Sequence, residues 1–250
     1  MATNDAHASA DARVAVYWAS FLGCSPAQLE TPGTWVGPHS AAGLADYRGV
    51  YLLRRGDSCV VSVPAPLLAM VTAQLGGLPA ASSFDVTRLQ HLFGDAIVRI
   101  VGPAWQGYLR GDDFRPAAGP NVRQLTTADE PALRLLAEAC DEQEWEDVGI
   151  GRAEQVIFGA FAGERLVAAG MGEPLAATLL HIGIVTHPDE RRQGHGRAVV
   201  SAISAYGLGV GLVPRYQALA ANTPSVAIAR ALGFTHYATT LAVRLSRLDA

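Results

Sequence analysis

The stretch Ile184–Ala198, IVTHPDERRQGHGRA, decides the fold. The apolar run 179–186 at its start predicts a strand, and apolar residues recur at helical spacing over 194–208. Gly194 and Gly196 separate the two elements, and glycine lets a backbone approach a ligand closely. A helix that begins directly after such a turn presents unpaired N–H groups at the positive end of its dipole. We therefore predict an anion site in this loop.

The side chains around the loop indicate which anion it binds. Arg191, Arg192 and Arg197 surround the glycines, and guanidinium groups pair well with phosphate oxygens, so a pyrophosphate is the expected ligand. Val199 stands where a dinucleotide-binding fingerprint needs its third small residue, which disfavours a dinucleotide. The chain contains no lysine, and a P-loop nucleotide site requires one, so that class is excluded.

The loop and a second signature downstream match the pattern of one family. Arg191–Gly196 reads Arg, two variable residues, Gly, one variable residue, Gly, and Asn222 and Leu232-Gly233-Phe234 flank a later helix. In these features the segment 121–245 resembles the GNAT acyltransferase superfamily, in a bacterial branch with an extra N-terminal domain. The resemblance implies a mixed, splayed central sheet with flanking helices, and acetyl-CoA as co-substrate with no metal. The CoA-binding residues that it implies are Ile184, Val185, Thr186, Arg191, Arg192, Gln193, Gly194, His195, Gly196, Arg197, Asn222 and Ser225.

The resemblance also implies the chemistry, in which an acceptor amine attacks the thioester directly. The amine must be neutral to attack, so a general base is expected. His181, on the strand before the loop, and Glu173, at the end of the preceding strand, are the candidates, with water or backbone as the alternative. Ala229 occupies the position where many members of the family carry a tyrosine that protonates the leaving thiolate. The sequence therefore leaves the general acid unidentified.

The acidic segment Asp141–Asp147 is the candidate binding region for the acceptor amine, because the resemblance implies that this region borders the acceptor pocket. Glu142, Glu144 and Trp145 are the candidate substrate-binding residues, and a solvated helix face is the alternative interpretation. We expect acetyl transfer to a primary amine of a small molecule. The alternatives are a protein or peptide N-acetyltransferase and a non-catalytic module that binds CoA or the acceptor.

Composition limits the partners. The 250 residues are 50% hydrophobic and carry a net charge of −4, so no basic surface for nucleic acid or anionic membrane is expected. No apolar run approaches the length of a transmembrane helix. Three widely spaced cysteines give no disulfide framework and no zinc pattern, which favours a reducing, cytoplasmic setting. A homodimer is among the assemblies that the sequence allows.

The chain is expected to form two α/β domains. The Pro-, Gly- and Ala-rich stretch 115–120 predicts a boundary, with an accessory domain at 1–118 and the acetyltransferase domain at 119–250. The first domain is expected to be the smaller one and either a degenerate GNAT-like unit or an accessory to the acceptor side. Its clearest signals are a hairpin at 50–63 and a helix after Asp85. The element order predicted for the second domain is β-α-α-β-β-β-α-β-α-β.

Overall fold

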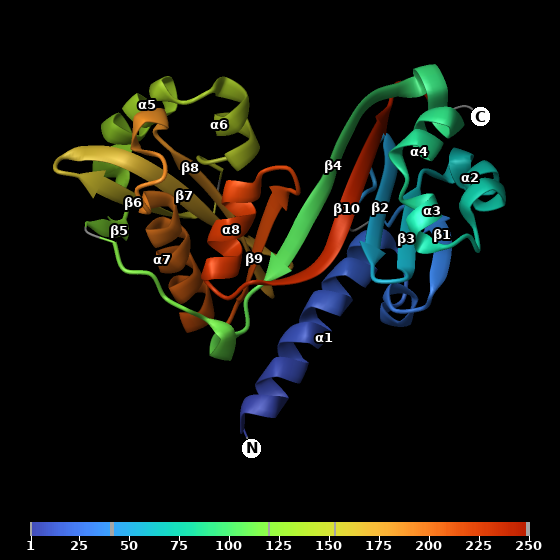
Figure 1. The fold of residues 1–250 in the computed structure, drawn as a ribbon, viewed down its shortest axis with the longest axis horizontal. Coiled ribbons are helices and arrows are strands. Elements are labelled where there is room, and N and C mark those ends of the chain that lie inside the picture. The colour runs from blue at the N-terminus through green and yellow to red at the C-terminus, as the bar shows by residue number, and fades with distance from the viewer. Residues whose placement is uncertain (1, 41–42, 120, 153, 249–250) are drawn as a thin grey trace. The chain divides into compact units, whose positions relative to one another are not determined.

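The computed structural model describes residues 2–40, 43–119, 121–152 and 154–248. Internal contacts divide the chain into two compact α/β units, which Figure 1 shows as a ribbon. Unit 1 contains the described residues of 1–106, 219–221 and 237–250, and unit 2 contains those of 107–218 and 222–236. The expected mixed α/β architecture, with an α/β region before the C-terminal half, is confirmed.

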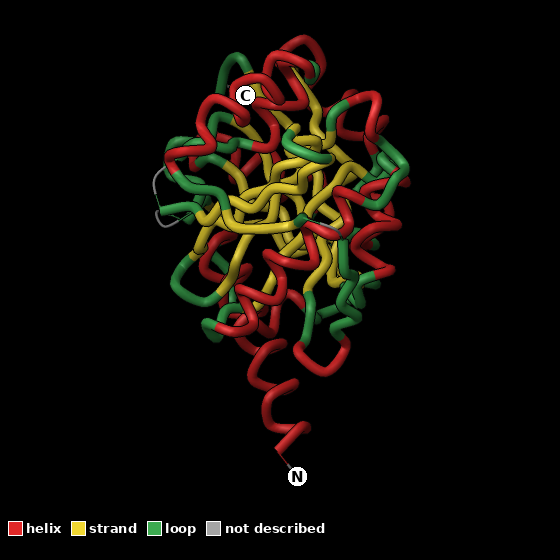
Figure 2. Tube along the Cα trace, turned by 90° about the vertical axis from the view of Figure 1, so that its left-hand side faces the viewer, coloured by secondary structure: helices red, strands yellow, loops and turns green. Residues whose placement is uncertain are grey.

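Unit 1 is a sheet of five strands in the order β1-β3-β2-β10-β4, with helices of its own. The strands are β1 (Gly33–Pro38), β2 (Gly49–Arg55), β3 (Ser58–Val63), β4 (Ile97–Tyr108) and β10 (Thr235–Leu245). The helices are α1 (Ala2–Leu22), α2 (Leu68–Leu75), α3 (Ala80–Ser83) and α4 (Val86–Phe93). Helix α1 begins beside the N-terminus that is marked in Figure 2. Short 3-10 helices lie at Pro26–Leu29, Ala65–Leu67 and Gly94–Ala96.

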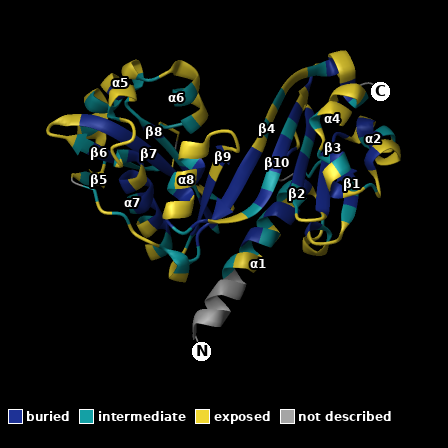
Figure 3. Ribbon diagram, in the orientation of Figure 1, coloured by how far each residue is buried: buried dark blue, intermediate teal, exposed yellow. Residues whose placement is uncertain are grey.

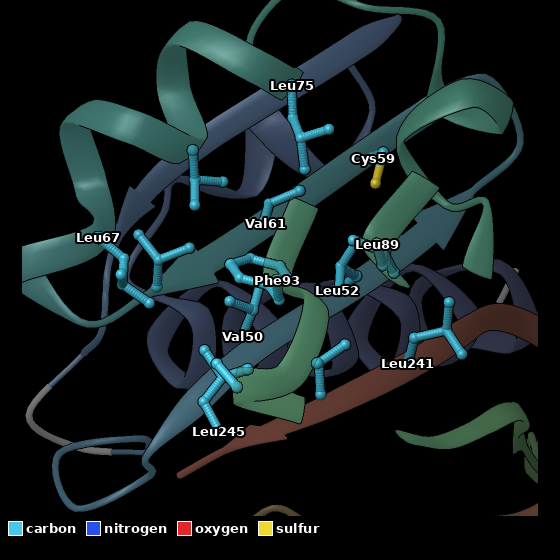
Figure 4. Close-up of a cluster of buried hydrophobic side chains, with 14 of the residues drawn as sticks. Val50, Leu52, Cys59, Val61, Leu67, Leu75, Leu89, Phe93, Leu241 and Leu245 are labelled. Atoms are coloured by element: carbon cyan, nitrogen blue, oxygen red, sulfur yellow. The ribbon is translucent and has the colours of Figure 1, made fainter. Parts of the chain in front are cut away.

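Local sequence explains the main elements of unit 1. The hairpin of β2 and β3 forms as expected, and its turn contains Gly56 at φ +59, a conformation that glycine adopts without strain. Asp85 caps α4 by accepting a hydrogen bond from the N–H of Arg88 at 2.8 Å. Every residue of β3 is buried, as the dark blue strand in Figure 3 shows. Figure 4 shows the apolar cluster that β2, β3 and β10 form with the helices, including Leu52, Val61 and Leu241.

Unit 2 follows the predicted element order except for its last strand, which is β10 of unit 1, and its sheet has the order β9-β8-β7-β6-β5. Its strands are β5 (Val122–Gln124), β6 (Val156–Ala162), β7 (Arg165–Leu175), β8 (Leu179–Thr186) and β9 (Val213–Leu219). Its helices are α5 (Glu130–Ala139), α6 (Glu142–Val148), α7 (His195–Gly209) and α8 (Thr223–Ala231), with 3-10 helices at Gly111–Asp113, Thr127–Asp129 and Pro188–Glu190. Helix α7 packs closely on β7, because Gly170 and Gly172 have no side chain and leave room for Ile203.

Three features of the structure are not apparent from the local sequence. The Pro- and Gly-rich segment 25–40 contains β1, which pairs in parallel with β3. Strand β4 continues past Gly102-Pro103 to Tyr108, although that dipeptide is typical of a break. The units therefore separate after Gln106, inside β4, and not in the stretch 115–120, of which Pro120 lies outside the described residues.

Candidate active site

Strands β8 and β9 run in parallel and then diverge. They pair from Leu179–Ile182 against Val213–Tyr216, and the register ends at Ile182↔Tyr216. On its other edge β8 stays paired with β7 as far as Thr186. The peptide groups of residues 183–186 that face β9 therefore have no ladder partner in that strand. We call this stretch the divergence, and its free strand edge suits an extended ligand that adds like another strand.

The loop of residues 191–196, which the sequence predicts to bind phosphate and which we call the phosphate loop, lies at the open end of the divergence. Arg192 has φ +64 and Gly194 has φ +89, and these two left-handed residues turn the chain into α7. Gly194 is the N-cap and provides no side-chain acceptor, so the first N–H groups of α7 are left for a ligand. A β-carbon on Gly196 would lie 3.0 Å from the hydroxyl of Thr186. Glycine at that position thus lets the helix begin directly against the end of β8.

The loop side chains divide into two groups. Arg191 is held within the protein: its Nε donates to the carbonyl of Thr186 at 3.2 Å, and its Nη2 pairs with Glu144 at 2.7 Å. Arg192 and Arg197 are exposed and therefore accessible to a phosphate. Glu190 accepts a hydrogen bond from Gln193 at 3.0 Å and lies 3.7 Å from Nε2 of His195. Arg165 also pairs with Glu190.

His181 is central to a row of polar side chains on the sheet. Glu173 of β7 lies opposite His181, and Arg215 of β9 lies opposite it on the other side, so the three share one face. Nδ1 of His181 is buried and has no hydrogen-bond partner among the described residues. Burial, together with the smaller effects of the guanidinium groups of Arg215 and Arg152, lowers the pKa of His181 to about 3. The imidazole is therefore neutral at pH 7.

The other two charges beside His181 are engaged. Glu173 lies 3.9 Å from Nη1 of Arg152 in a partly exposed ion pair. Arg215 is buried, and its Nη2 donates to the side chain of Gln217 at 2.7 Å. The sequence alone gave no reason to select Arg215, because its importance comes from the parallel register between β8 and β9. The structure brings together both candidate bases, His181 and Glu173, on adjacent strands.

The acidic segment forms α6, and its side chains have local roles. Asp141 caps the helix through the N–H of Glu144 at 3.1 Å, and Glu144 itself pairs with Arg191 of the phosphate loop. Trp145 packs against the apolar cluster of Leu136 and Val185. Glu142 and Glu146 are exposed to solvent. Of the three candidate acceptor residues, Glu144 contacts the loop, Trp145 packs against the apolar cluster and Glu142 faces water.

No group of histidine, cysteine and acidic residues in the described part of the chain has the arrangement of a metal site. Among the described helices, none combines the length and the apolar character needed to cross a membrane.

Comparison with known proteins identifies the family of the domain that contains this candidate site. The family described as "Acetyltransferase (GNAT) family" matches residues 121–234. These residues are a GNAT acetyltransferase domain. No curated protein matches the chain. Among solved structures, a GNAT-family acetyltransferase from Colwellia psychrerythraea is similar at 16% identity and TM-score 0.49, over 72% of this chain and 70% of that one. A GCN5-related N-acetyltransferase from Kribbella flavida is similar at 17% identity and TM-score 0.48, over 64% of each chain.

The second signature of the GNAT domain lies beside the divergence, at the start of α8 (Figure 1). Asn222 caps α8 by accepting from the N–H of Ser225 at 3.2 Å. The hydroxyl of Ser225 lies 2.7 Å from the hydroxyl of Tyr216 on β9, a contact that sequence reasoning missed. Ala229 lies one turn later and is fully buried. Because it is an alanine, it provides no hydroxyl at the position where the family often has a tyrosine.

Proposed function

We propose that the protein transfers an acetyl group from acetyl-CoA to a primary amine of a small molecule, by direct attack in a ternary complex. The observation that supports this most strongly is the combination of a diverging strand pair with an anion loop at its open end. A molecule with a pyrophosphate at one end and an amide-containing arm at the other is complementary to that combination. Acetyl-CoA has this chemistry.

The residues that would hold acetyl-CoA follow from the site. The N–H groups of Arg192–Gly196, with the guanidinium groups of Arg192 and Arg197, would bind the pyrophosphate. The peptide groups of residues 184–186 that face away from β7 would bind the arm as an added strand. An N–H of β8 would stabilise the oxyanion of the tetrahedral intermediate. Asn222 shapes the start of α8, and Arg191 fixes the loop against β8.

The proton acceptor in this proposal is His181. A neutral imidazole can take the proton that the amine loses, either directly or through water. Its low pKa makes it a weak base, so an acceptor that places negative charge near the imidazole would strengthen it. Glu173, opposite on β7, is the second candidate, and its carboxylate lies 3.9 Å from Nη1 of Arg152. Protein or peptide amines are the alternative acceptors.

The setting that we propose is the reducing cytoplasm. The structure has Cys24, Cys59 and Cys140 as free thiols, and free thiols persist in reducing compartments. Burial raises the pKa of the Cys59 thiol to about 12, so this group is not a nucleophile at neutral pH. Cys59 is therefore not a candidate for carrying the acetyl group as an acyl-enzyme intermediate, in agreement with direct attack by the amine.

The CoA site is tested by thermal unfolding with and without acetyl-CoA. A ligand at one hundred times its Kd stabilises a folded protein by about 2.7 kcal/mol, so the Tm should rise. Gly196→Asp should abolish the rise, because its carboxylate would repel the phosphate and its β-carbon would crowd Thr186. Gly209→Asp, at the exposed far end of the same helix, is the matched control and should keep it. An unchanged rise in folded Gly196→Asp would remove the loop from the CoA site.

Turnover is tested by incubation with acetyl-CoA and a mixed panel of amines, with free CoA thiol as the readout. Thiol release that depends on an amine supports the transferase. Acetyl-CoA binding without release for any amine in the panel would favour the alternative, a CoA-binding module without turnover.

A further inference from the structure

Tyr216 and Ser225 form a hydroxyl pair at the closed end of the divergence. Tyr216 is only 1% exposed, and its hydroxyl lies 2.7 Å from Oγ of Ser225 on the first turn of α8. Tyr216 also stands opposite Ile182 in the last register pair before the strands separate. The pair lies on the sheet face of Ile182 and not on that of His181, because successive strand residues point to opposite faces.

The direction of this hydrogen bond follows from burial. Burial raises the pKa of the Tyr216 hydroxyl, so it keeps its proton at neutral pH. In the described structure Ser225 is its hydrogen-bond partner, and a buried hydroxyl proton without an acceptor is costly. Tyr216 therefore donates and Ser225 accepts. The proton of the Ser225 hydroxyl is left to point away from Tyr216, as a donor for a ligand.

The position of the pair along the divergence indicates which part of a ligand it meets. The phosphates would bind beyond Thr186, and the distance along β8 from Thr186 back to Ile182 is about 13 Å at the usual rise per residue. Helix α8 extends along the same stretch, since Ile228 lies 3.7 Å from the position of a β-carbon on Gly196, at the open end. Ser225 is at the other end, where the arm of a bound CoA would finish in its sulfur.

We propose that Ser225 donates a hydrogen bond to the CoA sulfur and stabilises the thiolate that leaves, with Tyr216 as the residue that positions it. This rests on the proposed acetyl transfer. The amine nitrogen forms a bond to the carbonyl carbon, its proton passes to the base on the other face, and the C–S bond then breaks with its electron pair on sulfur. The thiolate, held by Ser225, takes a proton from water afterwards. Ser225 thus replaces the hydroxyl that Ala229, one turn later, lacks.

The test is the pKa of the thiol in bound CoA, followed by the ultraviolet absorbance of the thiolate as the pH is raised. A hydrogen bond to an anion is stronger than one to its neutral acid, so Ser225→Ala should raise the pKa of the bound thiol by about one unit. Tyr216→Phe should raise it less, because the serine hydroxyl remains but loses its orientation. The arginines of the phosphate loop and the His181 row also act on the thiol, but they are the same in every variant compared.

Two controls separate this effect from a change in the fold. Ser204→Ala removes a buried serine whose hydroxyl bonds the carbonyl of Val200 inside α7, and it should leave the thiol pKa unchanged. Desulfo-CoA should bind wild type and Ser225→Ala equally, since it has no sulfur. With acetyl-CoA, Ser225→Ala should lower kcat about tenfold at unchanged KM, and Ser225→Thr should restore part of the loss.

The outcomes distinguish a failure of the role of Ser225 from a failure of the proposed acetyl transfer. An unchanged thiol pKa in Ser225→Ala, with CoA bound, overturns the role of Ser225 and leaves acetyl transfer standing. Equal losses of affinity for CoA and desulfo-CoA also overturn it, because they show a structural role. If CoA does not bind the wild-type protein, the proposed function fails, and this role of Ser225 fails with it.

Discussion

Two histidines, His39 in unit 1 and His181 in unit 2, differ in how their ring nitrogens are satisfied. In unit 1, both ring nitrogens of His39 have partners at 2.9 Å, Ser62 and the carbonyl of Gly49, and Gln106 donates to Thr240 at 2.9 Å. In unit 2, Nδ1 of His181 has no partner in the described structure, and the edge of β8 beyond Ile182 lacks a ladder. A buried group without a partner is costly and often marks a site for a ligand. Unit 2 thus combines an unsatisfied ring nitrogen with an open strand edge beside the candidate site.

The largest expected effect is on the free energy of unfolding, when a cavity is made in the core of unit 1. Leu52 is fully buried in the cluster of Figure 4, and Leu52→Ala should lower the free energy of unfolding by about 2–5 kcal/mol. The affinity of the folded variant for acetyl-CoA should not change. Val98→Ala, at a side chain 61% exposed, should stay within about 0.5 kcal/mol of wild type. Denaturant unfolding and CoA titration measure both quantities. A weakened CoA affinity in folded Leu52→Ala would contradict the proposed placement of the CoA site in unit 2.

The next effect concerns the unsatisfied histidine. His181→Ala should reduce kcat about a hundredfold while acetyl-CoA still raises the Tm, because in the proposed mechanism the residue takes the proton of the amine and does not bind CoA. Glu173→Ala is the parallel variant, since Glu173 stands opposite His181. Steady-state kinetics on the best amine found distinguish the two. Wild-type turnover in both variants would leave water or backbone as the proton acceptor.

A smaller effect is expected in the pH dependence of stability. The pKa of His181 is about 3 in the folded protein and near 6.5 when unfolded. Between these values the unfolded chain binds the extra proton, so stability falls as the pH drops through this window. His181→Gln removes that contribution and should lose less stability than wild type between pH 7 and pH 4. Chemical denaturation at several pH values measures it, and identical slopes in the two proteins would show that His181 titrates normally.

The smallest effect should come from the link between α6 and the phosphate loop. Glu144→Gln weakens the pair with Arg191, in which both side chains are partly exposed, so acetyl-CoA affinity should fall by about 0.5 kcal/mol, roughly twofold. The double variant Glu142→Gln, Glu146→Gln removes the same kind of charge from the solvent-facing side of α6. It should leave CoA affinity unchanged and raise the acceptor KM if the acceptor is a cation. An unaltered KM would make these two carboxylates a solvated helix face.

Much of the site follows from local sequence. The phosphate loop depends on residues within Arg191–Gly196, and the caps at Asp85 and Asn222 depend on side chains three residues from their partners. Such features form from short-range geometry, so a pattern of a few residues is enough to predict them.

The parts that the sequence did not reveal depend on distant pairing. Strand β1 is a strand because β3 pairs with it, and its Gly and Pro residues indicate a loop when they are considered alone. The pair of Arg191 with Glu144 joins residues 47 positions apart, and only the register of β8 and β9 makes Arg215 a neighbour of His181. Ser225 was expected to bind the cofactor, but its orientation by Tyr216 depends on the packing of α8 on β9.

Strand β10 limits how the protein can be divided into fragments. It begins in unit 2, and most of it pairs with β2 in unit 1, from Thr239↔Arg54 to Arg244↔Gly49. A fragment that starts after residue 118 would keep β10 but lose β2, leaving an unpaired strand with Leu241 and Val243 in water. An exposed apolar edge of this kind promotes aggregation. Expression of the acetyltransferase half alone should therefore give insoluble protein, whereas a fragment ending near His236 avoids the orphaned strand.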